Sequence, residues 1–170
     1  MTIDTLKRLL TFVLLCLAQA LVLNRIQLFG CAMPLLYVYL VISFPRNYPR
    51  WASLLWAFAM GVCADMFANT PGVAMTSLTL LAFVQPVLLE LFVPYDADAN
   101  SKVSIATLGF NKFFFYALLM VLLYCLVFFL LEAFSFFNWQ HWLECVGGST
   151  VVTLLLVTTL ANWGGKKVER

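Results

Sequence analysis

The sequence predicts an all-α, polytopic integral membrane protein with six transmembrane helices. Of its 170 residues, 64% are hydrophobic and only 11% are charged, whereas a soluble domain has about 25% charged residues. Six apolar runs are also long enough to cross a bilayer, which takes about 17–25 helical residues. The runs cover residues 6–23, 28–44, 51–68, 72–92, 113–131 and 143–162, and we expect them to form a single domain.

The distribution of lysine and arginine favours one orientation in the membrane. Cytoplasmic loops of membrane proteins carry an excess of these two residues. With a cytoplasmic N-terminus, nine of them fall on the cytoplasmic side and only Arg25 falls on the other. We therefore expect both termini to lie in the cytoplasm.

The first two runs each contain a feature that affects the span. Lys7-Arg8 stands at the start of the first run, and Ala18-Gln19-Ala20 further along it matches a signal-peptidase site. The run continues beyond this site to Leu23, so we expect an uncleaved anchor rather than a cleaved signal peptide. Pro34 lies inside the second run, and we expect it to kink that helix.

The third and fourth runs form a helical hairpin that places one carboxylate, Asp65, at membrane depth. At 1.5 Å per residue, Asp65 lies about 21 Å beyond Trp51, in the outer third of the bilayer. A stripe of small residues on the same helix face would allow another helix to approach closely. Asp65 is therefore predicted to be a buried hydrogen-bond acceptor, a ligand or a proton site; the alternative is a hydrated carboxylate at the outer interface. The stripe consists of Ala57, Gly61, Ala64 and Ala68.

Two more polar residues lie in the fourth run. Gln85 is deep in the span, so its amide is expected to bond to a neighbouring helix. Glu90 is close to the inner interface, where a carboxylate can reach water. We therefore expect an interfacial residue rather than a proton carrier.

The polar loop after the fourth run starts like a calcium loop, with Asp96, Asp98 and Asn100 at alternating positions. Ser101 and Thr107 stand where that loop needs glycine and glutamate. We therefore predict no metal site and a solvated cytoplasmic loop.

The last two runs differ in character. The fifth is densely aromatic and without a small-residue face, so we expect it to face lipid or another bulky membrane helix. Trp139 and Trp142 follow it and predict an aromatic belt at the outer interface, or a docking site for a partner's helix. The sixth run begins with small and hydroxylated residues such as Ser149 and Thr150, which favour close packing and hydroxyls bonded back to helix carbonyls.

Groups for catalysis are scarce in this sequence. It contains no glycine-rich phosphate loop, no HExxH and no GxSxG, and His141 is its single histidine. The five cysteines form no CxxC pair, and most lie inside apolar runs as small hydrophobes. We therefore expect a protein that is not an enzyme, with no catalytic residues and no cofactor.

The chain resembles the rod shape-determining MreD family in length, in its six spans and in a signature around the third span. In that signature a glycine precedes an aspartate at the helix end, and a turn then leads to a Pro-Gly that opens the next helix. A glycine that the family often has soon after the aspartate is missing here, so Asn69 or Ala68 is expected to take its place. The residues that carry the resemblance are Gly61, Asp65, Pro71 and Gly72, together with Pro34 in the second span.

The resemblance implies a non-enzymatic scaffold in the bacterial inner membrane. Such proteins belong to the machinery that elongates the cell wall. They bind the bitopic protein MreC and, through it, MreB, RodA and a penicillin-binding transpeptidase. Asp65 would then be structural, bonding across helices or to the partner.

The same family is similar in fold to the substrate-binding subunits of energy-coupling-factor vitamin transporters, which supplies an alternative function. Such a subunit would hold a small molecule from outside, near Asp65 and Asn69. Those subunits usually carry an AxxxA pattern on an early helix. Here Ala18 and Ala20 are spaced by two residues instead of four, which counts against the alternative.

Overall fold

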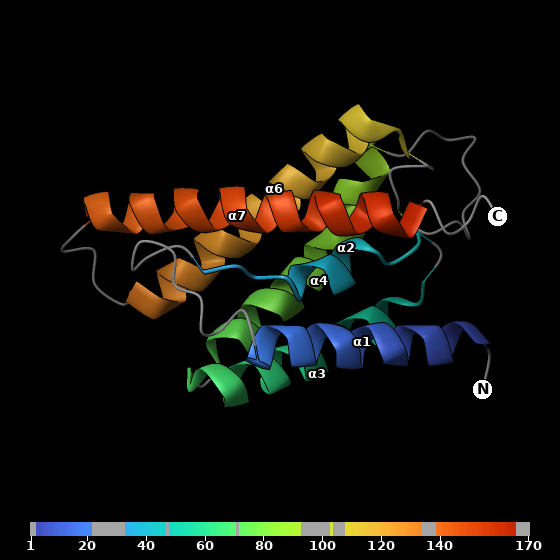
Figure 1. Ribbon diagram of the computed structural model, residues 1–170, viewed down its shortest axis with the longest axis horizontal. Helices are drawn as coiled ribbons and strands as arrows, with labels where there is room; N and C mark the ends of the chain where they lie inside the picture. The colour runs from blue at the N-terminus through green and yellow to red at the C-terminus, as the bar shows by residue number, and fades with distance from the viewer. Residues whose placement is uncertain are drawn as a thin grey trace.

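The computed structural model describes residues 3–21, 33–46, 48–70, 72–92, 103, 108–133 and 139–165, and its regular elements there are helices (Figure 1). Four helices are long and apolar enough to span a membrane, and α1 contributes a shorter apolar stretch, Arg8–Gln19. The helices are α1 (Ile3–Leu21), α2 (Val38–Ile42), α3 (Arg50–Ala68), α4 (Val73–Phe92), α6 (Phe110–Ala133) and α7 (Trp139–Gly165).

The helices form a bundle with two distinct ends. The starts of α1, α3 and α6 and the end of α7 lie at one end (Figure 1). We call it the basic end because α3 begins at exposed Arg50 and exposed Lys112 lies in the first turn of α6. The opposite end holds the turn between α3 and α4 and the end of α6, and we call it the turn end. The start of α1 and the end of α7 share one end, as expected for a chain with both termini on one side of a membrane. Which side that is stays a prediction.

The second predicted span is not a continuous helix. Residues 33–37 are non-helical, and helix α2 is only five residues long, so the expectation of a helix over 28–44, kinked at Pro34, is wrong for residues 33–37. Residues 28–32 lie outside the described part of the chain. Pro34 has no N–H to give to a helix, and its ring disfavours helical geometry in the residue before it.

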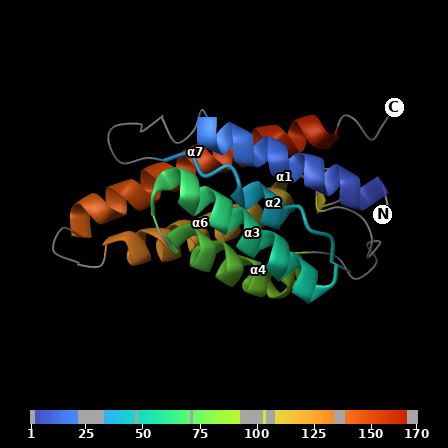
Figure 2. The same cartoon turned by 90° about the horizontal axis from the view of Figure 1, so that it is seen from below.

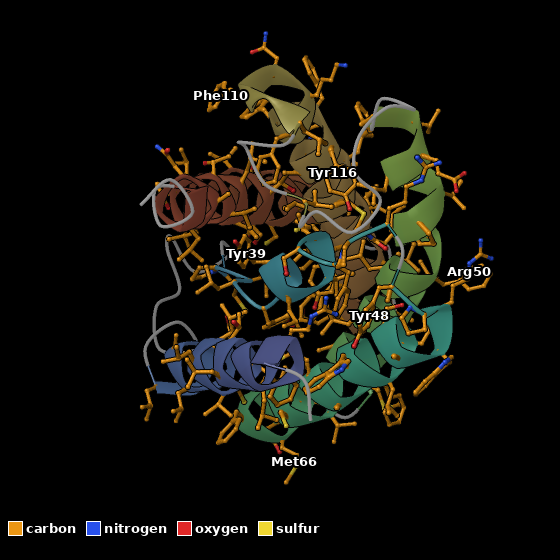
Figure 3. All side chains as sticks on the ribbon, turned by 90° about the vertical axis from the view of Figure 1, so that its right-hand side faces the viewer. Tyr39, Tyr48, Arg50, Met66, Phe110 and Tyr116 are labelled. Atoms are coloured by element: carbon orange, nitrogen blue, oxygen red, sulfur yellow. The ribbon has the colours of Figure 1, made fainter. Side chains whose placement is uncertain are left out.

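The short helix α2 lies at the centre of the bundle. Figure 3, seen from the basic end, shows α2 enclosed by the longer helices. Its side chains Val38, Leu40, Val41 and Ile42 are all buried. The core therefore forms around a short apolar helix that comes directly after an unwound segment.

Helix α6 buries one face in the core, while Phe115, Leu119 and Leu130 on its other face are exposed. This arrangement is compatible with the expectation that the aromatic fifth span faces lipid or another bulky membrane helix. One face of α6 is buried against α2, α4 and α7. Its large rings fill the space that a five-residue helix leaves between the longer helices, so a small-residue face is not needed. The buried residues recur at helical spacing: Phe113, Tyr116, Ala117, Met120, Val121, Tyr124, Cys125, Phe128 and Phe129.

Helix α1 is fastened to the bundle by aromatic contacts. At the basic end the Arg8 guanidinium lies over the Tyr48 ring, 4.0 Å from its centroid, and Tyr48 stacks on Phe44. Further along, Phe12 packs edge-on against Trp56 of α3. Trp56 therefore packs α3 against α1.

Helices α3 and α4 form the most extensive helix pair and lie side by side (Figure 2). Their closest approach is at Gly61, where an added Cβ would lie 2.4 Å from the Cα of Met75 and 2.8 Å from its nitrogen. Ala57 and Ala64 of the small-residue stripe are buried, whereas Ala68 is exposed. On the other side of α3, Met66 points away from the bundle (Figure 3).

Replacing Gly61 by alanine is expected to force α3 and α4 apart. We predict a loss of about 1–3 kcal/mol in stability, the usual cost of overpacking, seen as a lower midpoint of thermal unfolding in detergent. Gly147→Ala is the matched control, because a Cβ at Gly147 meets nothing within 4 Å. Equal midpoints for the two variants would contradict the close approach at Gly61.

Candidate functional site

The Asp65 carboxylate holds the start of α4. It lies in the last turn of α3 and is 7% exposed. Its Oδ1 accepts the backbone N–H of Ala74 at 2.8 Å and the Thr70 hydroxyl at 3.2 Å, and its Oδ2 accepts the N–H of Met75 at 3.0 Å. Asp65 therefore caps the N-terminus of the neighbouring helix across the turn.

This arrangement explains how a carboxylate is tolerated inside an apolar bundle. The first N–H groups of a helix have no partner within the helix, and its N-terminus carries a partial positive charge. The Asp65 carboxylate accepts two of these N–H groups at the start of α4 and places a negative charge beside its N-terminus. Of the roles considered for Asp65, the structure contains the buried hydrogen-bond acceptor that joins two helices.

The turn between α3 and α4 depends on two residues with positive φ. Asn69 (φ 57°) ends α3 in the left-handed conformation, and its N–H donates to the Asp65 carbonyl. Asn69 thus takes the place expected for the missing glycine, since asparagine tolerates this conformation better than most residues. Gly72 has φ 87° just before α4. Pro71 lies outside the described residues.

A second polar cluster supports the unwound segment at Pro34. The Gln19 amide nitrogen of α1 donates to the Pro34 carbonyl at 2.9 Å, and its amide oxygen accepts the N–H of Leu36 at 3.1 Å. One buried amide therefore satisfies a backbone acceptor and a backbone donor that helical geometry would have paired internally.

Helix α7 supports the same segment from the other side. The Ser149 hydroxyl accepts the N–H of Met33 at 3.0 Å, and the Thr153 hydroxyl accepts the N–H of Leu35 at 3.1 Å. Thr150 instead bonds back to the Val146 carbonyl, as predicted for the hydroxyls of this helix. Unpaired backbone groups are costly in an apolar interior. By pairing those of residues 33–36, the side chains of Gln19, Ser149 and Thr153 allow the span to be interrupted.

The remaining polar predictions have separate outcomes. Gln85 has the interhelical partners expected of it, since its amide donates to the Phe44 carbonyl and the Tyr116 hydroxyl, both at 3.3 Å. Trp142 is half-buried and packed against the core. The side chain of Trp139 lies outside the described part, as do Asp96 and Asp98, so neither the belt nor the loop prediction is tested.

A cavity of about 320 Å³ lies at the turn end, between the Asp65 cap of α4 and the Gln19 amide that supports the unwound segment. It is lined by the unwound segment and by residues of α1, α3, α4 and α6. Phe67, Ala68 and Glu132 of the lining are exposed, so the cavity reaches the surface of the described chain. The lining includes Gln19, Leu35, Tyr37, Ala68, Thr70 and Glu132.

A buried pair of phenols lies beside this cavity. The hydroxyls of Tyr37 and Tyr124 are 2.7 Å apart, and their rings meet edge-on. Two hydroxyl hydrogens share this one hydrogen bond, so one of them needs another acceptor. Either hydroxyl can be the donor of this bond. Tyr37 lines the cavity, so when Tyr124 donates, the hydrogen that needs another acceptor is that of Tyr37.

Sequence analysis found the hairpin carboxylate but missed the residues around the unwound segment. Gln19 was noticed only as part of a cleavage-site pattern, although an amide inside an apolar run is itself a signal of an interhelical hydrogen bond. Ser149 and Thr153 were expected to bond within their own helix. Nothing in the local sequence pairs them with residues 33–35.

Comparison with known proteins identifies no relative of this chain: no family model, no curated protein and no solved structure matches it. Within the described residues, no group of three or more histidine, cysteine or acidic side chains is placed to hold a metal ion.

Removing the carboxylate at position 65 is expected to loosen the start of α4. We predict that Asp65→Ala costs about 0.5–2 kcal/mol, as for loss of an N-cap, and that Asp65→Asn costs less because one acceptor oxygen remains. Hydrogen exchange at the Ala74 and Met75 amides should accelerate in the same order. Glu90→Gln, an exposed change on the same hairpin, is the control, and unchanged exchange in Asp65→Ala would contradict the cap.

Replacing Gln19 by methionine, which has a similar shape, should destabilise the unwound segment. The Pro34 carbonyl and the Leu36 N–H would lose their partner, at about 1–3 kcal/mol for each buried group left unsatisfied. Thermal unfolding and exchange of the Leu36 amide measure the effect. Thr159→Val is the control, because that exposed hydroxyl bonds only within its own helix; equal stability of the two variants would refute the role of Gln19.

Proposed function

We propose that this chain is a non-enzymatic scaffold of the machinery that elongates the wall of rod-shaped bacteria, in the inner membrane. It binds a bitopic MreC-like protein and, through it, MreB, RodA and a penicillin-binding transpeptidase. The proposal starts from the resemblance of the α3–α4 region to the MreD family.

One observation supports the proposal most directly: three of the signature residues, Gly61, Asp65 and Gly72, combine into a single structural joint. Gly61 allows the two helices to touch, Asp65 caps the second helix, and Gly72 has the positive φ that the turn requires. The Asp65 carboxylate is engaged by two backbone N–H groups and a hydroxyl. These residues hold two helices in a fixed arrangement. Such a role suits a protein that presents a fixed shape to its partners.

Partner capture tests the proposal. The full chain, tagged at its C-terminus, is cross-linked in native membranes, extracted in mild detergent and analysed by mass spectrometry. We expect a bitopic coiled-coil protein together with a wall glycosyltransferase and a transpeptidase. Asp65→Asn should lower their recovery per molecule of scaffold in the membrane and widen the cells, while Glu90→Gln should not.

Two results would overturn the scaffold proposal. One is unchanged cell width after both deletion of the chain and the Asp65→Asn substitution. The other is recovery of an ABC-type ATPase module in place of the wall synthases.

The second of those results would favour the alternative, a solute-binding subunit of an energy-coupling-factor type transporter. The cavity at the turn end is the observation that keeps this function in view, because 320 Å³ is within the usual range for a small-molecule site. Uptake of labelled vitamins that does not depend on this chain would remove it.

A further inference from the structure

The cavity at the turn end has the size and lining of a ligand site. Sites for small molecules commonly measure about 300–1,000 Å³ and combine apolar walls with a few placed polar groups. This cavity, of about 320 Å³, has apolar walls from Leu35, Phe67 and Phe128.

Most polar groups of the lining are already engaged by the protein. Both ends of the Gln19 amide hold the unwound segment, and the Thr70 hydroxyl donates to Asp65. Two groups remain available to a ligand. They are the Tyr37 hydroxyl, whose hydrogen can point into the cavity, and the exposed Glu132 carboxylate at its surface end.

The negative charge of Glu132 indicates which ligand charge the cavity favours. Among the described residues that line the cavity, Glu132 is the one with a formal charge. A carboxylate beside aromatic rings attracts a positive group, because the ring faces carry negative charge and favour cations within about 6 Å. The rings of Tyr37, Phe67 and Phe128 all belong to the lining. Glu132 would repel an anionic ligand.

We propose that this cavity binds a small organic cation, with its positive group near Glu132 and its apolar body between Leu35 and Phe128. The Tyr37 hydroxyl supplies a hydrogen bond to an acceptor atom where the ligand has one. This inference does not depend on whether the chain acts as a scaffold or as a transport subunit, since it concerns the purified chain alone.

Binding of benzyltrimethylammonium to the purified full chain in an uncharged detergent tests the proposal by equilibrium dialysis. Benzyl alcohol and benzoate serve as neutral and anionic comparators of similar shape. We expect the cation to bind at least tenfold more tightly than either comparator. Glu132→Gln should weaken cation binding about tenfold, the order expected for losing one charged contact.

Two further variants serve as a control for charge and as a block of the cavity. Glu144→Gln removes an exposed carboxylate that does not line the cavity and should leave binding unchanged. Ala68→Leu adds bulk to the lining from an exposed position, where folding tolerates it, and should abolish binding of every probe. The proposal fails if the cation does not bind, if benzyl alcohol binds equally well, or if Glu132→Gln and Ala68→Leu bind the cation like the wild type.

Discussion

The structure depends on the need to pair every backbone polar group inside an apolar bundle. A continuous helix meets this need by itself, but among the described residues the chain departs from helical geometry at residues 33–37 and at the α3–α4 turn, among other places. In these two places polar side chains take over the pairing. Asp65 does so for α4, and Gln19, Ser149 and Thr153 do so for the unwound segment. Asp65, Gln19, Ser149 and Thr153 are therefore found where the backbone is irregular, whereas Thr150 bonds within its own helix.

The sequence was informative where local patterns decide the structure. Apolar length located four of the predicted spans as long helices, and the small residues with Asp65 indicated a tight hairpin. The break in the second span was not predictable from residues 28–44, because an apolar run has the same composition in a helix and in a buried extended segment. Its partners Ser149 and Thr153 lie more than a hundred residues away in sequence.

The proposed scaffold and the proposed ligand site use different parts of the same end of the molecule. The signature residues are engaged in the α3–α4 joint, whereas Tyr37 and Glu132 keep hydrogen-bonding capacity facing the cavity. A ligand there would touch the unwound segment, α3 and α6 together. Its occupancy would therefore change how firmly these elements are held to one another, which links the cavity to any surface that a partner recognises on them.

The hydrogen bonds from residues 33–35 to α7 also set an order for assembly in the membrane. The chain enters the bilayer from its N-terminus, so the unwound segment is made long before Ser149 and Thr153, which follow the residues they bond by 116 and 118 positions. Until α7 arrives, only Gln19 of the nearby α1 can support that segment. Insertion of the last helix therefore supplies the hydroxyl partners of the unwound segment, which α1 cannot provide.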